Sequence, residues 1–127
     1  MSAPHDGSSA QAFARAWIEA WNRRDIDAVV SHYAAGGRFT SPVAHERMGT
    51  ATIVGRDMLK AYWSGARKLA SLKFTFDRAV WDSERRTLVV IYTSEREGKK
   101  QRAMEAMVFG TDGLIHEGEA MYGAALA

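Results

Sequence analysis

The chain has no cysteine and only two prolines among its 127 residues. The lack of cysteine excludes disulfide bonds, thiolate metal ligands and a cysteine nucleophile. No hydrophobic run reaches the length of a membrane span. The first residues carry neither the basic start nor the apolar stretch of a signal peptide, so we expect a cytoplasmic protein. Lys and Arg number 17 and Asp and Glu number 15, a net charge of +2 that is too small to indicate a nucleic-acid partner.

Motifs for several common kinds of site are also missing. The histidines do not form a pair at helical spacing, nor a recognised motif with carboxylates, so the sequence predicts no metal site. It has neither a glycine-rich phosphate loop followed by lysine nor the elbow motif of a serine hydrolase. We therefore expect no metal and no cofactor, and any chemistry falls to ordinary acidic, basic and hydroxyl side chains.

The composition favours a single globular domain, because 46% of the residues are hydrophobic and 25% are charged. Residues 1–8 show no periodicity and are predicted to be a tail. The domain is expected over residues 9–123, and residues 124–127 are expected to form a short C-terminal tail.

Helical periodicity marks three segments in the first half of the chain. Ser9 is a candidate N-cap for the first helix, and Asp25 for a second helix that is predicted to end at Gly36-Gly37. A third helix is predicted from about 56 to 69. Bulky apolar residues recur at helical spacing along the first helix: Phe13, Trp17, Ala20 and Trp21.

Strand patterns follow the helices. A short strand over 38–41 is expected to stop at Pro42, and residues 43–55 show no period and are predicted to be a loop. Four further strands are predicted over 72–80, 87–96, 101–110 and 114–122. Helices followed by antiparallel strands are typical of an α+β domain with the helices on one face of the sheet.

The strand over 101–110 is apolar on both faces, unlike a strand with one wet face. Its two faces carry Ala103, Glu105, Met107 and Phe109 on one side, and Met104, Ala106 and Val108 on the other. Burying the lone carboxylate of Glu105 costs several kcal/mol unless it pairs, protonates or meets a cavity. A raised pKa in an apolar cleft would make Glu105 a proton donor. The alternative is a salt bridge, for example to Arg96 or Lys100.

Four short segments carry a resemblance to a known superfamily: Ala20–Ala28, Phe39–Pro42, Gly55–Asp57 and Asp112–Ile115. With their order and spacing, residues 12–123 resemble the nuclear transport factor 2-like superfamily, and most closely its SnoaL-like members. The superfamily also holds the ketosteroid isomerases. The resemblance implies a cone, in which a curved, mixed but mainly antiparallel sheet wraps around the three helices and leaves a deep apolar pocket. It also implies a homodimer through the outer sheet face.

Three catalytic positions of the ketosteroid isomerases can be matched to this sequence. Their general-base aspartate corresponds to Ser41, their tyrosine proton donor to Trp17, and their protonated aspartate to Glu105. A serine hydroxyl is no base, and an indole N–H donates a hydrogen bond but does not titrate. The steroid isomerase mechanism is therefore not expected in this chain.

Other polar residues are candidates to assist Glu105. These are Ser41, His45 in the predicted loop, and His116, which we expect on the inner face of the last strand; the alternatives are a solvated loop for His45 and an acidic partner for His116. The expected lining of the pocket is an aromatic and methionine set: Trp17, Trp21, Tyr33, Phe39, Met58, Tyr62, Trp63, Met107 and Phe109.

Three hypotheses for function follow. The first is an enzyme doing cofactor-free acid–base chemistry, of isomerase, cyclase or dehydratase type, on an apolar carbonyl or hydroxyl compound, with Glu105 as acid or base. The second is a non-catalytic protein that binds a small apolar metabolite. The third is a dimeric scaffold whose pocket is filled by its own side chains.

Overall fold

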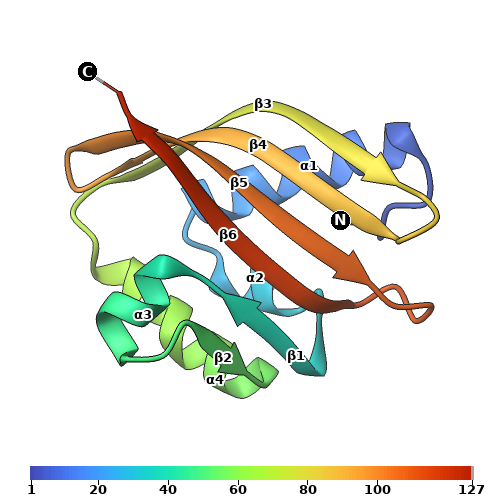
Figure 1. Cartoon of the computed structure of the whole chain (residues 1–127), viewed down its shortest axis with the longest axis horizontal. Coiled ribbons are helices and arrows are strands. Elements are labelled where there is room, and N and C mark those ends of the chain that lie inside the picture. The colour runs from blue at the N-terminus through green and yellow to red at the C-terminus, as the bar shows by residue number, and fades with distance from the viewer. Residues whose placement is uncertain (127) are drawn as a thin grey trace.

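The computed structural model describes residues 1–126. It confirms the α+β class, with helices packed on one face of a six-stranded sheet (Figure 1). The helices are α1 (Gly7–Asn22), α2 (Ile26–Val30), α3 (Pro42–Met48), α4 (Arg56–Trp63) and the 3-10 helix η1 (Ser64–Lys68). The strands are β1 (Tyr33–Thr40), β2 (Thr52–Val54), β3 (Leu72–Asp82), β4 (Thr87–Arg96), β5 (Lys99–Phe109) and β6 (Ile115–Ala125).

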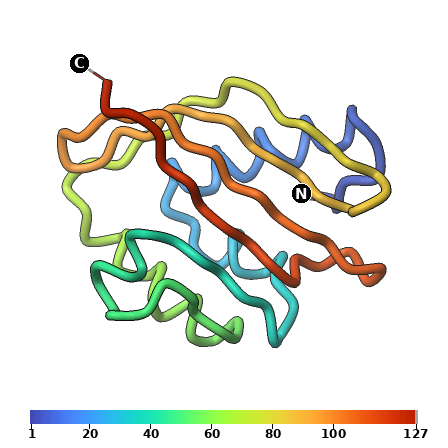
Figure 2. Tube along the Cα trace, in the orientation of Figure 1, coloured from blue at the N-terminus to red at the C-terminus, as the bar shows by residue number. Residues whose placement is uncertain are grey.

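The sheet has the strand order β2-β1-β6-β5-β4-β3. All neighbouring pairs are antiparallel except β1 and β6, which run parallel. The long strands of β3–β6 cross in front of α1. The shorter elements β1, β2, α3 and α4 lie together on the other side of β6 (Figure 2). Asn22 fixes the end of α1 to β3, since its side chain donates to the Phe74 carbonyl at 2.9 Å and accepts from the Phe74 amide at 2.7 Å.

The first helix begins earlier than its sequence pattern predicts. Asp6, not Ser9, is the N-cap, and its carboxylate accepts from the Ser9 amide at 2.7 Å. The Ser9 hydroxyl accepts in return from the Asp6 amide at 3.0 Å, which completes a capping box. Residues 7 and 8, predicted as tail, therefore belong to α1. At the other end of the chain β6 continues to Ala125, past the predicted limit at 123.

The second helix ends at Val30 rather than at the two glycines. Gly36 and Gly37 lie in the middle of β1, where the backbone is held by its neighbours. The Ile115 amide donates to the His32 carbonyl at 2.7 Å, and the Gly55 amide donates to the Gly37 carbonyl at 2.8 Å. Pairing with β6 and with the β2 region therefore overrides the glycine signal for a helix end.

The predicted loop over 43–55 contains two regular elements, α3 and β2. Ser41 caps α3 by accepting from the Val43 amide at 3.2 Å, and Pro42 occupies the first helical position. The helix ends at Gly49, whose φ of 74° is in the left-handed region. The third predicted helix is real over 56–63 and then tightens into η1.

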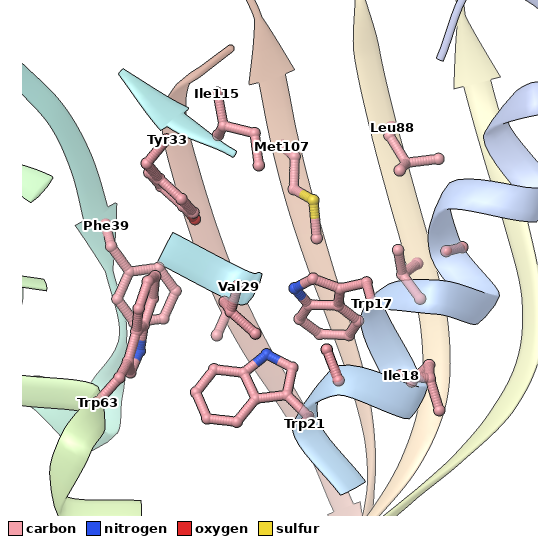
Figure 3. Close-up of a cluster of buried hydrophobic side chains, with 14 of the residues drawn as sticks. Trp17, Ile18, Trp21, Val29, Tyr33, Phe39, Trp63, Leu88, Met107 and Ile115 are labelled. Carbon is pink, nitrogen blue, oxygen red and sulfur yellow. The ribbon is translucent and has the colours of Figure 1, made fainter. Parts of the chain in front are cut away.

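One end of the domain is a closed hydrophobic core. Leu88, Met107 and Ile115 are each at most 1% exposed and lie on the inner face of the sheet (Figure 3). Phe13 of α1 is also 1% exposed and packs against Phe109 of β5. No helix within residues 1–126 is long and apolar enough to cross a membrane. The buried polar and charged residues are Ser41, Ser94, Gln101 and Glu105.

Candidate functional site

Glu105 lies on the inner face of the sheet, at the centre of the domain. On β5 the buried residues alternate with more exposed ones, and Glu105 takes its place in that row with 5% of its surface exposed. It is paired with Val90 on β4 and with Ala120 on β6, both buried. Within residues 1–126 no basic side chain forms an ion pair with Glu105. The salt bridge considered from the sequence is thus absent from the described residues.

Burial raises the pKa of Glu105 from 4.5 to about 8. The cause is desolvation, which disfavours the charged form of a carboxylic acid. At pH 7 roughly nine in ten molecules therefore carry the protonated side chain, which can donate a hydrogen bond. Burial also raises the pKa of Tyr92 and Tyr122, and negative charge on Glu105 raises both further, so the three groups lie near one another.

A cavity of about 70 Å³ lies beside Glu105. It has room for water or for a small chemical group, but it is about half the size of an apolar cavity of ~150 Å³ that accepts benzene. Its lining comes from α1, β1, α3, α4, η1 and β3–β6: Trp17, Trp21, Phe39, Ser41, Val43, Arg47, Tyr62, Trp63, Ala66, Leu69, Leu72, Phe74, Tyr92, Ser94, Arg96, Glu105 and Tyr122. A larger ligand would require the rings at its edge to move.

Two indole N–H groups in the cavity lining have no hydrogen-bond partner. They belong to Trp17 and Trp21, which lie on successive turns of α1 and are 2% and 7% exposed. Figure 3 shows both indoles on the same side of α1, with Trp63 and Phe39 across from them. Leaving a buried donor unpaired costs about 1–3 kcal/mol. A ligand oxygen or a water molecule in the cavity would remove this cost.

Hydroxyl groups complete the polar part of the lining. Ser41 and Ser94 are buried, and Tyr92 is 1% exposed. The Ser41 hydroxyl accepts from the Val43 amide as the cap of α3, and its O–H remains available as a donor. The arrangement therefore joins one neutral carboxylic acid to several hydrogen-bond donors in largely apolar surroundings.

The structure brings some of the predicted site residues together at this cavity and leaves others out. Glu105 and Ser41 line it, as do five of the predicted rings: Trp17, Trp21, Phe39, Tyr62 and Trp63. Three predicted lining residues, Tyr33, Met107 and Phe109, are instead buried core residues outside the lining. Met58 is 56% exposed on the surface of α4, so its prediction as a lining residue is wrong.

Neither candidate histidine reaches the cavity. His45 is exposed on α3 and lines a shallow surface depression. His116 is exposed, and its Nε2 atom lies 3.1 Å from Asp112, the acidic partner considered as the alternative. The inward orientation predicted for His116 is wrong, because the pairing of β5 with β6 skips this residue and so reverses the alternation before Gly118.

Sequence reasoning missed two tyrosines that belong to the site, Tyr92 and Tyr122. The signal for Tyr92 is the alternation of β4, in which it follows Val90 and precedes Ser94 on the inner face. Tyr122 alternates with Ala120 on β6, which is the signal that would place it on the inner face. The other lining residues not predicted are Val43, Arg47, Ala66, Leu69, Leu72, Phe74, Ser94 and Arg96.

Comparison with known proteins decides the family. The family model of the SnoaL-like domain matches residues 14–118. The chain belongs to the SnoaL-like domain family. This SnoaL-like domain is 31% identical to a SnoaL-like protein of unknown function from Burkholderia thailandensis E264, with a TM-score of 0.84 over 95% of this chain and 99% of that one.

Two more distant structures share the fold of this SnoaL-like domain. One is the epoxide hydrolase/cyclase-like enzyme SalBIII of pyran ring formation in salinomycin, at 14% identity and a TM-score of 0.75, covering 94% of this chain and 95% of that one. The other is a ketosteroid isomerase-like protein from Kribbella flavida. It is 17% identical, with a TM-score of 0.70, and the match covers 97% of this chain and 84% of that one. Among curated proteins, none matches the chain. In the described part of the chain, no cluster of three His, Asp or Glu could hold a metal ion.

Proposed function

We propose that this SnoaL-like domain catalyses cofactor-free proton transfer on a small apolar compound that carries a carbonyl or hydroxyl group. The observation that carries the proposal is the carboxyl group of Glu105, buried without an ionic partner beside a cavity. A carboxylic acid whose pKa is raised to about 8 is matched to proton transfer near neutral pH. An isomerase, a cyclase or a dehydratase could each use such a group.

The simplest balanced cycle uses Glu105 as both base and acid. Its ionised form takes a proton from the carbon next to a carbonyl, and the electron pair of that C–H bond forms an enolate. The indole N–H groups of Trp17 and Trp21 are free to donate to the enolate oxygen, where negative charge develops. Glu105 then returns the proton to carbon, which leaves the enzyme unchanged. Ser41 contributes by capping α3 at the edge of the cavity, not as a base.

The names of two structural relatives support chemistry of this kind on the fold. One is called an epoxide hydrolase/cyclase-like enzyme and the other is ketosteroid isomerase-like. At 14% and 17% identity they do not identify a substrate for this chain. Support for the reaction class therefore rests chiefly on Glu105 itself.

A second candidate function is non-catalytic binding of a small apolar metabolite. It is favoured by Trp17 and Ser41, which stand where the resemblance to ketosteroid isomerases calls for a tyrosine and an aspartate. In that case Glu105 and the two indoles would be polar anchors that orient a ligand. The two functions differ in whether a bound compound is altered.

Deuterium exchange tests the two functions without knowledge of the substrate. The protein is incubated in D2O with the ketones 4-phenyl-2-butanone and 2-tetralone, and deuterium next to the carbonyl is measured by NMR. We expect faster exchange than in buffer, and a loss of about 100-fold or more in Glu105→Gln. Glu119→Gln, an exposed carboxylate on β6, is the matched control and should retain the exchange.

Two outcomes would overturn catalysis by Glu105. Exchange that persists in Glu105→Gln would assign the proton transfer to another group. Binding of the ketones without any exchange, seen as shifts of the indole N–H signals, would favour the binding function.

We also propose a homodimer through the outer face of the sheet, as the sequence predicts. Ile91, Met104 and Met121 form a row across β4, β5 and β6 on that face, and the two methionines are 39% and 43% exposed. Exposed apolar rows of this kind mark interaction surfaces. Sedimentation should give a dimer that Met104→Asp dissociates, whereas a monomeric wild type would contradict the proposal. The cytoplasmic location stays a prediction.

A further inference from the structure

Two arginines line the outer part of the cavity, although its interior is apolar. Arg47 comes from α3 and Arg96 from the end of β4. On α3, Arg47 follows the lining residue Val43 by one helical turn, so both side chains lie on the face of α3 that borders the cavity. Arg96 is the last residue of the inward-facing row of β4 that also holds Tyr92.

The side chain of Arg96 turns back towards the cavity. Its backbone is paired with Lys99, next to the turn between β4 and β5. Its guanidinium carbon nevertheless lies 5.9 Å from the centre of the Tyr122 ring, and Tyr122 is paired with Ala103, two residues from Glu105. The guanidinium group thus lies near the face of the Tyr122 ring, and both side chains line the cavity.

Neither arginine has an ion-pair partner among residues 1–126. The neighbouring carboxylate of Glu97 is occupied, because it accepts from the Ala70 amide at 2.9 Å. Glu105 is the one carboxyl group in the cavity lining, and it is buried at the inner part. The cavity lining therefore combines two arginines that form no ion pair with unpaired N–H donors, and its one carboxyl group is neutral at pH 7; the charge of Glu46 acts on Tyr62 from outside the lining.

We infer that the compound bound by this SnoaL-like domain is an apolar carboxylic acid, held through its carboxylate by Arg96 and Arg47 while its carbonyl end reaches Glu105. Arginine donates paired hydrogen bonds that match the two oxygens of a carboxylate. This inference rests on the proposed function, since it names the class of ligand for the same cavity. It also gives the arginines a role in specificity that the proton transfer itself does not require.

The spacing of the residues limits the length of such a ligand. Glu105 is paired with Val90, and Arg96 lies six residues further along β4, a Cα separation of about 20 Å at ~3.3 Å per residue. The guanidinium carbon of Arg96 lies 5.9 Å from the centre of the Tyr122 ring, and Tyr122 is paired two residues from Glu105, about 7 Å along the strands, so the guanidinium group and the carboxyl group of Glu105 are about 10 Å apart. Contacts of about 3 Å at each end leave about 4 Å between the carbonyl and carboxylate groups of the ligand, which is their separation in the ketone acid 3-benzoylpropionate. This probe is larger than the cavity of about 70 Å³, so its binding requires the rings at the cavity edge to move.

The test compares 3-benzoylpropionate with its neutral primary amide. Dissociation constants are measured at pH 7 from the shifts of the indole N–H signals of Trp17 and Trp21. We expect the acid to bind at least about 10-fold more tightly than the amide, and the difference to shrink as salt is added. Arg96→Met and Arg47→Met should each reduce the preference, and the double variant should abolish it.

The controls separate loss of charge recognition from loss of structure. Lys99→Met removes a positive charge at the same turn as Arg96 but outside the cavity lining, and should keep the full preference. Affinity for the amide should be unchanged in Lys99→Met and should fall much less than affinity for the acid in the arginine variants, which shows that the cavity is intact. Arg96→Lys should recover part of the preference because it restores the charge without the planar donor pair.

Three results would overturn the inference: equal affinities for the acid and the amide, a preference that survives in the double variant, or no binding of either compound. The proposed proton transfer is tested separately with neutral ketones. If those ketones exchange through Glu105 but the acid has no advantage, only the ligand class is wrong. If the acid is preferred but no exchange occurs, the anion site stands and the catalytic proposal falls.

Discussion

Glu105 and Arg102 lie three residues apart on β5 but belong to opposite faces of the sheet. On the outer face Arg102 contacts the carboxylate of Asp77 and donates to the Thr93 hydroxyl at 3.1 Å. The hydrogen bond from Arg102 lowers the pKa of Asp77, whereas burial raises that of Glu105. Water and a charged partner keep the carboxyl group of Asp77 ionised at neutral pH. Glu105 has neither, so its carboxyl group stays protonated.

This contrast indicates what each face is suited to do. The carboxylate on the outer face is charged and paired, as expected for a solvated surface. The one on the inner face is neutral and unpaired, and it lies beside a cavity with free hydrogen-bond donors. A strand stabilised by packing alone would be expected to carry an apolar residue at position 105, so the exception points to function.

The largest expected effect is on the pH dependence of stability. The folded protein keeps Glu105 protonated up to about pH 8, whereas the unfolded chain ionises it above about pH 4.5. Its contribution to stability is therefore complete below pH 4.5 and is lost as the pH rises towards 8, by about 1.4 kcal/mol per pH unit. Relative to wild type, Glu105→Gln should lack this loss and become the more stable protein at pH 8.

Urea unfolding at pH 5, 6.5 and 8, at fixed protein concentration, measures this difference. Parallel stability curves for the wild type and Glu105→Gln would show that Glu105 has an ordinary pKa in the folded protein.

A smaller difference in stability is expected between alanine substitutions at two glycines of β6, Gly118 on the inner face of the sheet and Gly123 on the outer face. A Cβ atom on Gly118 would collide with the buried hydroxyl of Tyr33 on the inner face, and the rigid ring has no room to move. We expect Gly118→Ala to lower the free energy of unfolding by about 1–3 kcal/mol. Gly123→Ala adds a Cβ at ordinary contact distance, 3.5 Å from Arg102, and should change stability by about 0.5 kcal/mol or less.

Chemical denaturation of both glycine variants tests this prediction. An equal loss of stability in the two variants would mean that the inner face is not more tightly packed than the outer face along β6.

The smallest effect is expected for the ion pair on the outer face. Asp77 is exposed, and solvent screens its attraction to Arg102, so Asp77→Asn should shift the urea midpoint less than Gly118→Ala does. The pKa of Asp77 is lowered, so its contribution is present at neutral pH and is lost only as the pH falls into the acid range. A large destabilisation at pH 7 would contradict the assignment of this pair to a solvated surface.

The sequence predicts most of the fold and the residue at the centre of the site. Apolar alternation along 101–110 placed Glu105 on the same face as Met107, and both are buried. Its role in proton transfer stays a prediction. The fold class follows from elements with strong periodicity, because such patterns reflect burial on one face.

The errors arise where pairing between distant segments decides the structure. His116 points outwards because of an irregularity in the pairing of β5 with β6, which no local pattern of β6 encodes. The short helix α3 has a local signal, the Ser41 cap followed by proline, but its few apolar residues show no clear period. Whether Met58 faces the solvent or the cavity depends on how α4 packs against its neighbours. Periodicity alone does not determine this packing, and Met58 is in fact exposed.

The most direct test of the central claim is to titrate Glu105 by NMR. The side-chain carboxyl carbons of glutamate are labelled with 13C, and Glu105 is assigned by the signal that disappears in Glu105→Gln. Its chemical shift should change with a midpoint at about pH 8, since the carboxyl group is buried and has no ionic partner. A midpoint near the ordinary value of 4.5 would mean that Glu105 is solvated or paired in solution, and would contradict the account.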